Sequence, residues 1–322
     1  MKYYKLHITR TRYSRMKTSL LFFFFLVLCS PFPVAVVSAE ELQSRSAIVM
    51  DAATGNVLYA KNPDLRLMPA STTKLMTALV VIERVNLSDI VTISKNASYA
   101  APTKIGLRQG DRITVETLLY SALMKSANDA AVALAEAVAG SEEQFIYLMN
   151  KKAAALGLND TRFINCNGLP GTGQYITAYD LAKLLREAIR YPILREILGT
   201  RVAEVSIREG KAVFVKNTNR LLWADGEFLG GKTGYTRQAK HCFVGAGERE
   251  GRTMIVALLG TPVRDLLWEE TGILMNFGAR VLNNLEEPVV YLAQADYDAA
   301  KITKASYTKK SRPKKRAKKR HY

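Results

Sequence analysis

The sequence predicts an α+β fold in which an antiparallel sheet is flanked by helices and lies next to an all-helical subdomain. Two observations predict it. Before residue 200 the apolar residues mostly follow the helical period, and after it they alternate as in strands. Near the start, the apolar runs 47–51 and 57–61 are separated by the turn-like segment 53–56 and predict a β-hairpin. We expect this hairpin to join the later strands in one sheet, within a single domain without internal repeats.

The remaining elements follow in order along the chain. Helices are expected at 71–84, 115–124, 129–138, 141–156, 177–190 and 265–283. Pro192 is expected to stop the helix before it. Residues 90–114 look irregular with short strands, and 157–177 are expected to form a long loop. Further strands are expected at 201–207, 212–215, 228–233, 242–248 and 253–260.

The net charge of +17 is confined to the two ends of the 322-residue chain. Residues 1–17 contain six Lys/Arg, residues 301–322 contain eleven, and neither segment contains an acid. The other 29 basic residues are balanced by all 29 acidic ones. A fold that binds nucleic acid carries its basic charge on the fold itself, so no nucleic-acid partner is expected.

Residues 1–39 have the pattern of a secretory signal peptide. A basic stretch precedes the apolar run 20–28, two prolines break the run, and small residues at 37–39 offer a cleavage site. We therefore expect export to the periplasm or the cell-wall space. The alternative is an uncleaved N-terminal membrane anchor, for which the apolar run is short.

Residues 286–322 form a C-terminal extension that ends in a polybasic tail. Nine of the twelve residues at 309–320 are cationic, which is a composition typical of disorder. In an exported protein the expected partner of this tail is an anionic membrane surface or an anionic envelope polymer. The alternative is a solubilising tail without a specific partner.

Cysteine and histidine are scarce in the body of the chain. Cys166 and Cys242 do not make a disulfide framework, and we expect two buried thiols, with a single bridge as the alternative. His241 is the one histidine outside the two ends. This scarcity disfavours histidine-built metal sites and leaves a Ser-His-Asp triad dependent on His241, so neither metal nor cofactor is expected.

Ser71 and Lys74 open the expected helix 71–84, whose residues 75–82 are almost all apolar. A helix that is apolar all round is buried, and residues three apart share a face. Burial lowers the pKa of a lysine toward the range of a base, so the pair predicts a serine nucleophile activated by a lysine. The pattern Ser-x-x-Lys occurs four times in the chain, and the alternative is that Ser71 only caps the helix.

Two further patterns bear groups that an acyl transfer needs. Ser126 and Asn128 lie in the break between two helices, where the alternative is a polar turn with Asn128 as a cap. Lys232-Thr233-Gly234 follows a strand candidate and occurs once. Its cation and hydroxyl suit a carboxylate, and Gly234 leaves the strand edge open to an extended peptide. The alternative is a glycine-rich turn with a solvated lysine.

The order of these three patterns is typical of penicillin-binding proteins and class A β-lactamases. The chain resembles the serine-type D-alanyl-D-alanine carboxypeptidases, the low-molecular-mass penicillin-binding proteins of peptidase family S11. The resemblance implies a β-lactamase/transpeptidase-like fold, with a penicillin-binding D,D-peptidase domain at 40–285. It covers about residues 45–285 and includes the segments 47–78, 126–131, 149–150, 156–158, 167–170 and 177–182.

The resemblance implies catalytic roles for Ser71, Lys74 and Ser126. Ser71 would be acylated by the penultimate D-alanine of a peptidoglycan stem peptide, and the terminal D-alanine would leave. Water would then hydrolyse the acyl-enzyme. Lys74 is the implied base, while Ser126 and Asn128 assist proton transfer and positioning. β-Lactam antibiotics should acylate Ser71 as mimics of the substrate.

The resemblance also implies a set of substrate-binding residues in addition to Asn128. Lys232 and Thr233 would face the terminal carboxylate, and Gly234 would leave room for the substrate backbone. The oxyanion hole would be the backbone N–H groups of the nucleophile and of Tyr235. Arg264 stands where such enzymes often place an arginine for the carboxylate, and a solvated cation is the alternative.

Other functions compete with the carboxypeptidase interpretation. The nearest is a D,D-endopeptidase that uses the same residues on cross-linked peptides. A class A β-lactamase would need a deacylating glutamate where this chain has Ala155. The non-enzymatic alternative is a cationic envelope-binding protein. The chain departs from many relatives at Gln174, where they have histidine. It also leaves only 37 residues after the expected domain end at residue 285, too few for the second domain that many relatives carry.

Overall fold

The computed structural model describes residues 42–208 and 211–292. The expected signal peptide and the basic tail lie outside the described residues. Among the helices of the described ranges, none combines the length and the apolar character that crossing a membrane requires.

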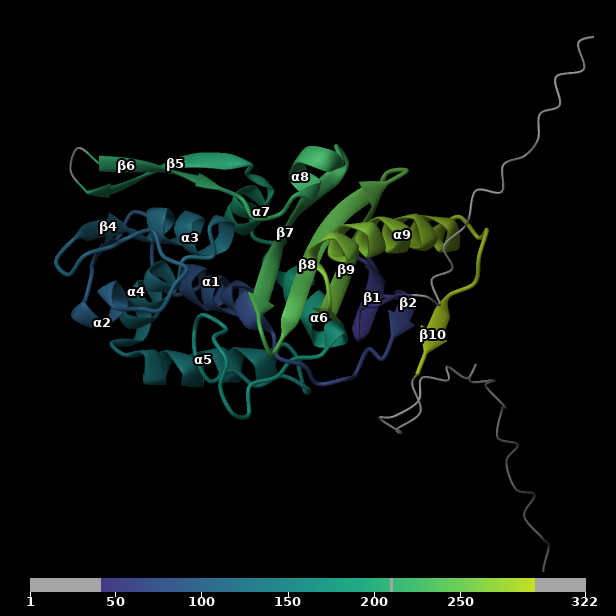
Figure 1. Cartoon of the computed structure of the whole chain (residues 1–322), viewed down its shortest axis with the longest axis horizontal. Helices are drawn as coiled ribbons and strands as arrows, with labels where there is room; N and C mark the ends of the chain where they lie inside the picture. The colour runs from purple at the N-terminus through teal and green to yellow at the C-terminus, as the bar shows by residue number, and fades with distance from the viewer. Residues whose placement is uncertain (1–41, 209–210, 293–322) are drawn as a thin grey trace, which may run out of the picture. The chain divides into compact units, whose positions relative to one another are not determined.

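A six-stranded sheet forms the centre of the described structure (Figure 1). Its strand order is β10-β2-β1-β9-β8-β7, and every pair is antiparallel except β10 with β2. The expected N-terminal hairpin joins the later strands through β1 and β9, where Ser46 pairs with Leu259. The strands are β1 Ser46–Asp51, β2 Val57–Lys61, β7 Phe228–Thr236, β8 Lys240–Arg249, β9 Arg252–Thr261 and β10 Val289–Tyr291.

Helices cover both faces of the sheet, with α9 (Arg264–Leu282) on one and α6 (Ala178–Ala188) on the other (Figure 1). Alternate residues of β1 therefore enter different cores. Val49 packs in the core beneath α9, whereas Ile48 packs in the core shared with the helical part. Burial on both faces explains why β9 reads as a nearly continuous apolar run. The expected α+β class is confirmed.

The helical part surrounds α1 (Lys74–Ile82), whose residues Lys74–Val81 are all buried. Helices α3, α4, α5 and α6 contact α1, which is why that helix is apolar on every side. The short strands β3 and β4 form a separate two-stranded sheet. The other elements here are β3 Ile90–Thr92, α2 Lys95–Ser98, β4 Arg112–Thr114, α3 Val115–Met124, α4 Asn128–Ala139 and α5 Glu142–Ala155.

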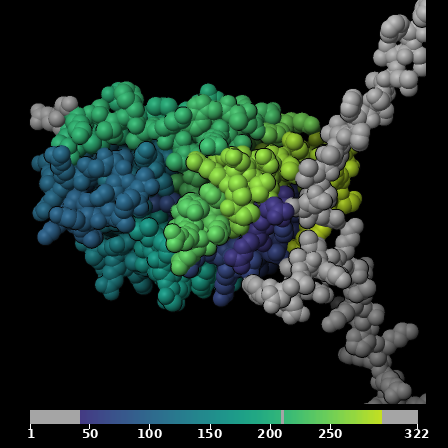
Figure 2. All heavy atoms as spheres, in the orientation of Figure 1, coloured from purple at the N-terminus to yellow at the C-terminus, as the bar shows by residue number. Residues whose placement is uncertain are grey.

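The segment after α6 differs from the expectation in two details. Helix α6 ends at Ala188, before Pro192 as expected, but Pro192 then begins a further helix that was not expected, α7 (Pro192–Gly199), because proline has no N–H to lose at the first helical position. Strands β5 (Val202–Arg208) and β6 (Lys211–Lys216) pair with each other and stay apart from the large sheet. They pack instead on the helical part, along which residues 202–208 and 211–216 run in Figure 2.

Three short elements were not expected from the sequence, namely α2, α8 (Leu221–Ala224) and β10. Each has three or four residues, which is too short for a hydrophobic period to show. Strand β10 pairs with β2 in parallel and lies beyond residue 285, the expected end of the domain. The sheet therefore includes part of the expected C-terminal extension.

Candidate active site

Ser71 lies in a 3₁₀ turn, Ala70–Thr73, and Lys74 is the first residue of α1. Lys74 is fully buried, and its Nζ donates hydrogen bonds to Ser71 Oγ at 3.1 Å, Asn128 Oδ1 at 2.7 Å and the Asn167 carbonyl at 2.6 Å. The predicted contact between serine and lysine is therefore present. Ser71 does not cap α1, because Thr73 occupies the N-cap position and makes no side-chain cap bond.

Burial sets the protonation of Lys74. Loss of hydration lowers the pKa of its amine from 10.5 to about 7, although the nearby Cys166 and Asp129 act in the opposite direction. A lysine with a pKa near neutrality is neutral in a large fraction of molecules at pH 7. Its nitrogen can then accept the proton of the Ser71 hydroxyl.

Ser126 and Asn128 fill the break between α3 and α4. Ser126 adopts a left-handed conformation with φ of 66°, which ends α3 and turns its side chain into the site. Asn128 begins α4, and its amide donates to the carbonyls of Ala101 and Pro102, each at 3.0 Å. Those bonds orient the amide oxygen toward Lys74. The alternative in which Asn128 caps a helix is wrong, since Ala127 is the N-cap residue.

Lys232 and Thr233 lie within β7, which continues to Thr236. Lys232 is fully buried, and its Nζ donates to Ser126 Oγ at 3.1 Å and to the Thr233 carbonyl at 3.0 Å. The alternative of a solvated lysine is therefore wrong. Burial and the nearby charge of Lys74 place the pKa of Lys232 well below its usual range. A bound carboxylate would supply the counter-charge that the protein around Lys232 does not.

Gly234 brings β7 against the turn that holds Ser71. A Cβ atom at Gly234 would lie 2.9 Å from the backbone nitrogen of Ser71, so only glycine allows this approach. Tyr235 follows at the strand edge, and its ring packs 4.5 Å from that of His241. The backbone nitrogens of Ser71 and Tyr235 thus belong to two segments in direct contact, as a shared oxyanion hole requires.

A cleft of about 840 Å³ opens over these residues. The cleft is lined by Ser71, Ser126, Thr233, Gly234, Tyr235 and Arg264. Behind this lining, buried Lys74 donates to Ser71 and buried Lys232 donates to Ser126, while buried Asn128 accepts from Lys74. The structure therefore brings all nine predicted site residues to one place. The remaining lining residues are Thr103, Lys125, Lys216, Asn217, Thr218, Arg220, Trp223, His241, Leu267 and Trp268.

Two residues of the site were missed by sequence reasoning. Thr218 Oγ1 lies 2.6 Å from Thr233 Oγ1, and no local pattern marks it as functional. The Asn167 carbonyl accepts from Lys74, while Gly168 lies so close to the 3₁₀ turn that a Cβ atom there would be 1.8 Å from the Ala70 carbonyl oxygen. The asparagine–glycine pair at 167–168 was the available signal for a special backbone segment.

His241 lines the same cleft without taking the place of a triad histidine. Burial, assisted by the positive charges of Arg264 and Lys240, lowers the pKa of its imidazole. Its described ring contact is with Tyr235, and no hydrogen bond joins it to Ser71 in the described part of the chain. Lys74, not His241, is the base within hydrogen-bond distance of the serine.

Cys166 and Cys242 are both free and buried, which confirms the expected thiols. Burial raises the pKa of Cys166 well above its usual range, and that of Cys242 to about 12. Neither thiol is activated as a nucleophile.

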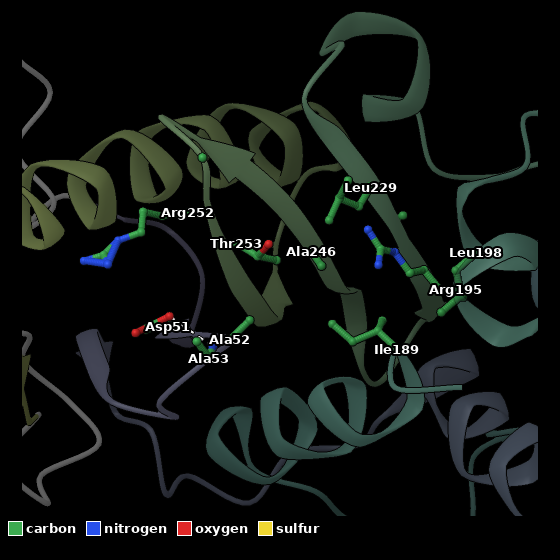
Figure 3. A pocket seen from close by; sticks show the side chains of 12 residues that line it. Asp51, Ala52, Ala53, Ile189, Arg195, Leu198, Leu229, Ala246, Arg252 and Thr253 are labelled. Carbon is green, nitrogen blue, oxygen red and sulfur yellow. Dashed lines mark hydrogen bonds between the residues drawn. The ribbon is translucent and has the colours of Figure 1, made fainter. Parts of the chain in front are cut away.

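A second cavity, of about 370 Å³, lies at the start of β7, around Leu229 and Gly230 (Figure 3). Arg195 and Arg252 stand on opposite sides of it. None of the predicted site residues lines this cavity, so it is separate from the cleft over Ser71.

Comparison with known proteins agrees with this geometry. The family model of D-alanyl-D-alanine carboxypeptidases matches residues 34–263. The carboxypeptidase DacF of Bacillus subtilis is 38% identical over 68% of this chain and 57% of its own length, so this chain spans little more than half of that relative. A D-alanyl-D-alanine endopeptidase of Pseudomonas aeruginosa is 38% identical over 68% of this chain and 72% of its own.

The fold of this chain is also similar to that of a solved structure. The D-alanyl-D-alanine carboxypeptidase of Mycobacterium tuberculosis superposes with a TM-score of 0.72 at 30% identity, covering 77% of this chain and 95% of that one. The family match, these relatives and the shared fold lead to one conclusion. The chain belongs to the D-alanyl-D-alanine carboxypeptidase family, peptidase family S11.

Proposed function

We propose that this protein is a serine D,D-carboxypeptidase that removes the terminal D-alanine from peptidoglycan stem pentapeptides. The observation that carries the proposal is the buried amine of Lys74, 3.1 Å from Ser71 Oγ, beside the Lys232-Thr233-Gly234 segment of β7. Few surroundings other than an acyl-transfer site explain a fully buried lysine with its pKa lowered to about 7.

Acylation begins when neutral Lys74 takes the proton of Ser71 as Oγ attacks the carbonyl carbon of the penultimate D-alanine. The oxyanion then faces the backbone N–H groups of Ser71 and Tyr235. Ser126, which accepts a hydrogen bond from Lys232, carries a proton to the departing amine. The amide bond breaks, D-alanine leaves, and an ester joins the stem peptide to Ser71. Water hydrolyses that ester and regenerates the serine.

Substrate binding depends on the carboxylate of the departing D-alanine. Lys232 and Thr233 receive it, and the hydroxyl of Thr218 holds that of Thr233 at 2.6 Å. Arg264 adds a second positive charge from the start of α9, and no ion pair within residues 42–208 and 211–292 neutralises it. Asn128 orients the substrate amide and Lys74.

β-Lactam antibiotics are proposed inhibitors, because their strained amide and carboxylate match the same groups. Residue 155, at the exposed end of α5, is alanine and supplies no carboxylate for deacylation of the kind that class A β-lactamases use. The adduct at Ser71 should therefore be long-lived.

The proposal also assigns a role to each end of the chain and includes export of the protein. Residues 1–39 serve as a signal peptide, residues 40–285 as the peptidase domain, and residues 286–322 as an extension whose basic tail attracts the protein to anionic membranes or envelope polymers. Deletion of residues 301–322 tests this role of the tail. If the shortened protein distributes between membrane and soluble fractions as the full chain does, the proposed attraction to membranes is contradicted.

The central experiment has two parts. Purified protein is incubated with a stem pentapeptide, and released D-alanine is measured. It is also incubated with a penicillin, and mass spectrometry of tryptic peptides locates the adduct. We expect D-alanine release and an adduct on Ser71, with both lost in Ser71→Ala. Ser94→Ala is a matched control, since Ser94 caps α2 and lies outside the cleft lining. An adduct at another residue, or release that persists in Ser71→Ala, would refute the proposal.

An endopeptidase is the second candidate. The observation that favours it is the 38% identity to the Pseudomonas aeruginosa endopeptidase. Cleavage of cross-linked peptides uses the same chemistry with a larger leaving group.

A further inference from the structure

Asp129, the second residue of α4, has a fully buried carboxylate that takes no part in the proposed acyl transfer. Its two oxygens accept hydrogen bonds from the backbone N–H groups of Ile105 at 3.2 Å, Gly106 at 3.0 Å and Leu107 at 3.1 Å. The N–H of Ala130 donates to it as well, at 3.0 Å. Within residues 42–208 and 211–292 it forms no ion pair, so these N–H groups are its partners.

Residues 101–107 form a loop without helix or strand, and Asn128 and Asp129 hold it at two places. Asn128 donates to the carbonyls of residues 101–103, twice through its side-chain amide at 3.0 Å and once through its backbone N–H at 2.7 Å. Asp129 accepts from the N–H groups of residues 105–107. Two neighbouring residues at the start of α4 therefore fix the beginning and the end of one loop.

The orientation of the Asn128 amide depends on this loop. Its Oδ1 accepts from Lys74 Nζ at 2.7 Å, whereas its Nδ2 faces the loop carbonyls. The amide presents its oxygen to the lysine only while those carbonyls receive its N–H groups, because a rotated amide would place donors against the amine. Without the Asp129 carboxylate the buried N–H of Leu107 would have lost its acceptor, which favours movement of the loop.

The carboxylate also acts on the lysine through its charge. Asp129 and Cys166 raise the pKa of Lys74, although burial outweighs both. Lys232, on β7, is a cation that faces the same amine, and Lys74 lowers its pKa. The carboxylate of Glu142 contacts the cysteine through the Cys166 N–H, at 3.0 Å. Removal of the Asp129 charge should therefore lower the pKa of Lys74 further.

We propose that Asp129 is a positioning residue for the base Lys74. Its carboxylate fixes loop 101–107, and the loop fixes the Asn128 amide that holds the lysine amine beside Ser71. Asp129 does not line the cleft and acts through Asn128. The inference rests on the proposed function, because it requires that acylation of Ser71 depends on Lys74.

The test measures the second-order rate constant for labelling by a fluorescent penicillin between pH 5 and pH 9. Each profile gives a midpoint, which reports the pKa of Lys74, and a plateau at high pH, where the lysine is neutral. The variants are Asp129→Asn, Asp129→Glu and the matched control Glu136→Gln. Glu136 lies on the same helix and also accepts hydrogen bonds from a neighbouring segment, from Ser94 at 2.6 Å and Asn96 at 2.9 Å.

We expect Asp129→Asn to move the midpoint about one pH unit below that of the wild type and to lower the plateau about tenfold. The midpoint falls because the protonated lysine loses both a nearby negative charge and the fixed oxygen of Asn128. Asp129→Glu keeps the charge but displaces the loop, so its midpoint should stay near that of the wild type while its plateau falls. Glu136→Gln should match the wild type in both quantities.

Folding of each variant is verified by its thermal unfolding midpoint and by the resistance of Cys242 to a thiol reagent. The wild-type protein provides a test that needs no substitution. Its amide protons at residues 105–107 should exchange with deuterium about tenfold or more slowly than those of the exposed loop residues Thr172 and Gly173, as measured by NMR. Equal exchange rates would overturn the proposed role of Asp129, even if Asp129→Asn does not fold.

Two results with folded variants would also overturn the proposal. One is an Asp129→Asn profile with the midpoint and the plateau of the wild type. The other is a lowered plateau with an unchanged midpoint, which a merely structural role would give. A wild-type protein that penicillin does not label and that releases no D-alanine would instead refute the proposed function, and this inference with it.

Discussion

Raising the pH from 5 to 8 should increase the rate constant for acylation of Ser71, because Lys74 must be neutral to accept the hydroxyl proton. The ionisable groups that influence this amine are Asp129 and Cys166, which raise its pKa, and Lys232, whose own pKa Lys74 lowers. Burial outweighs the first two and brings the pKa of Lys74 to about 7.

The size of the effect follows from that pKa. A group with a pKa near 7 is neutral in about half of the molecules at pH 7, in about 1% at pH 5 and in roughly 90% at pH 8. The rate constant for acylation should therefore rise about 50-fold from pH 5 to pH 7 and only about twofold above it. A lysine with the ordinary pKa of 10.5 would be neutral in only about one molecule in 3,000 at pH 7.

The assay follows labelling of the protein by a fluorescent penicillin. Samples are quenched at successive times, and the second-order rate constant for labelling is determined at closely spaced pH values. Lys74→Arg is the matched variant, since arginine keeps its charge throughout this range. It should label about 10²–10⁴-fold more slowly at pH 7, without the rise centred near 7. A wild-type rate that does not change between pH 5 and 8, or a midpoint near 10, would refute the role of Lys74 as the base.

Three further predictions concern the surroundings of the site. Gly234→Ala should slow penicillin labelling roughly a hundredfold by pushing β7 off the Ser71 turn, whereas Gly226→Ala, with open space around it, should not. Thr218→Val should raise KM for the pentapeptide about fivefold by removing the hydrogen bond to Thr233, with Thr218→Ser near wild type; equal KM values would contradict that role. Cys166 and Cys242 should resist a thiol reagent at pH 8 until the protein is unfolded, and reaction in the native state would contradict their burial.

Much of the fold and of the site was predictable from local pattern. Hydrophobic periodicity identified the buried helix at Ser71, the N-terminal hairpin and the strands that became β7, β8 and β9. The scarcity of histidine and the order of three short patterns pointed to a lysine-activated serine. Each hydrophobic pattern, and each of the three short patterns, lies within a few consecutive residues, where the spacing of side chains along a helix or strand already determines which of them share a face.

Only the tertiary structure decided which groups Lys74 and Lys232 contact, how deeply they are buried and, for that reason, in which direction their pKa values move. Lys74 meets the side chain of Asn128, 54 positions away, and the carbonyl of Asn167, 93 positions away, while Lys232 meets Ser126 across 106 positions. The packing of α1 among other helices removes water from Lys74 and so sets its pKa. Pairings over such separations, like that of β10 with β2, depend on how elements pack, and local sequence carries no record of it.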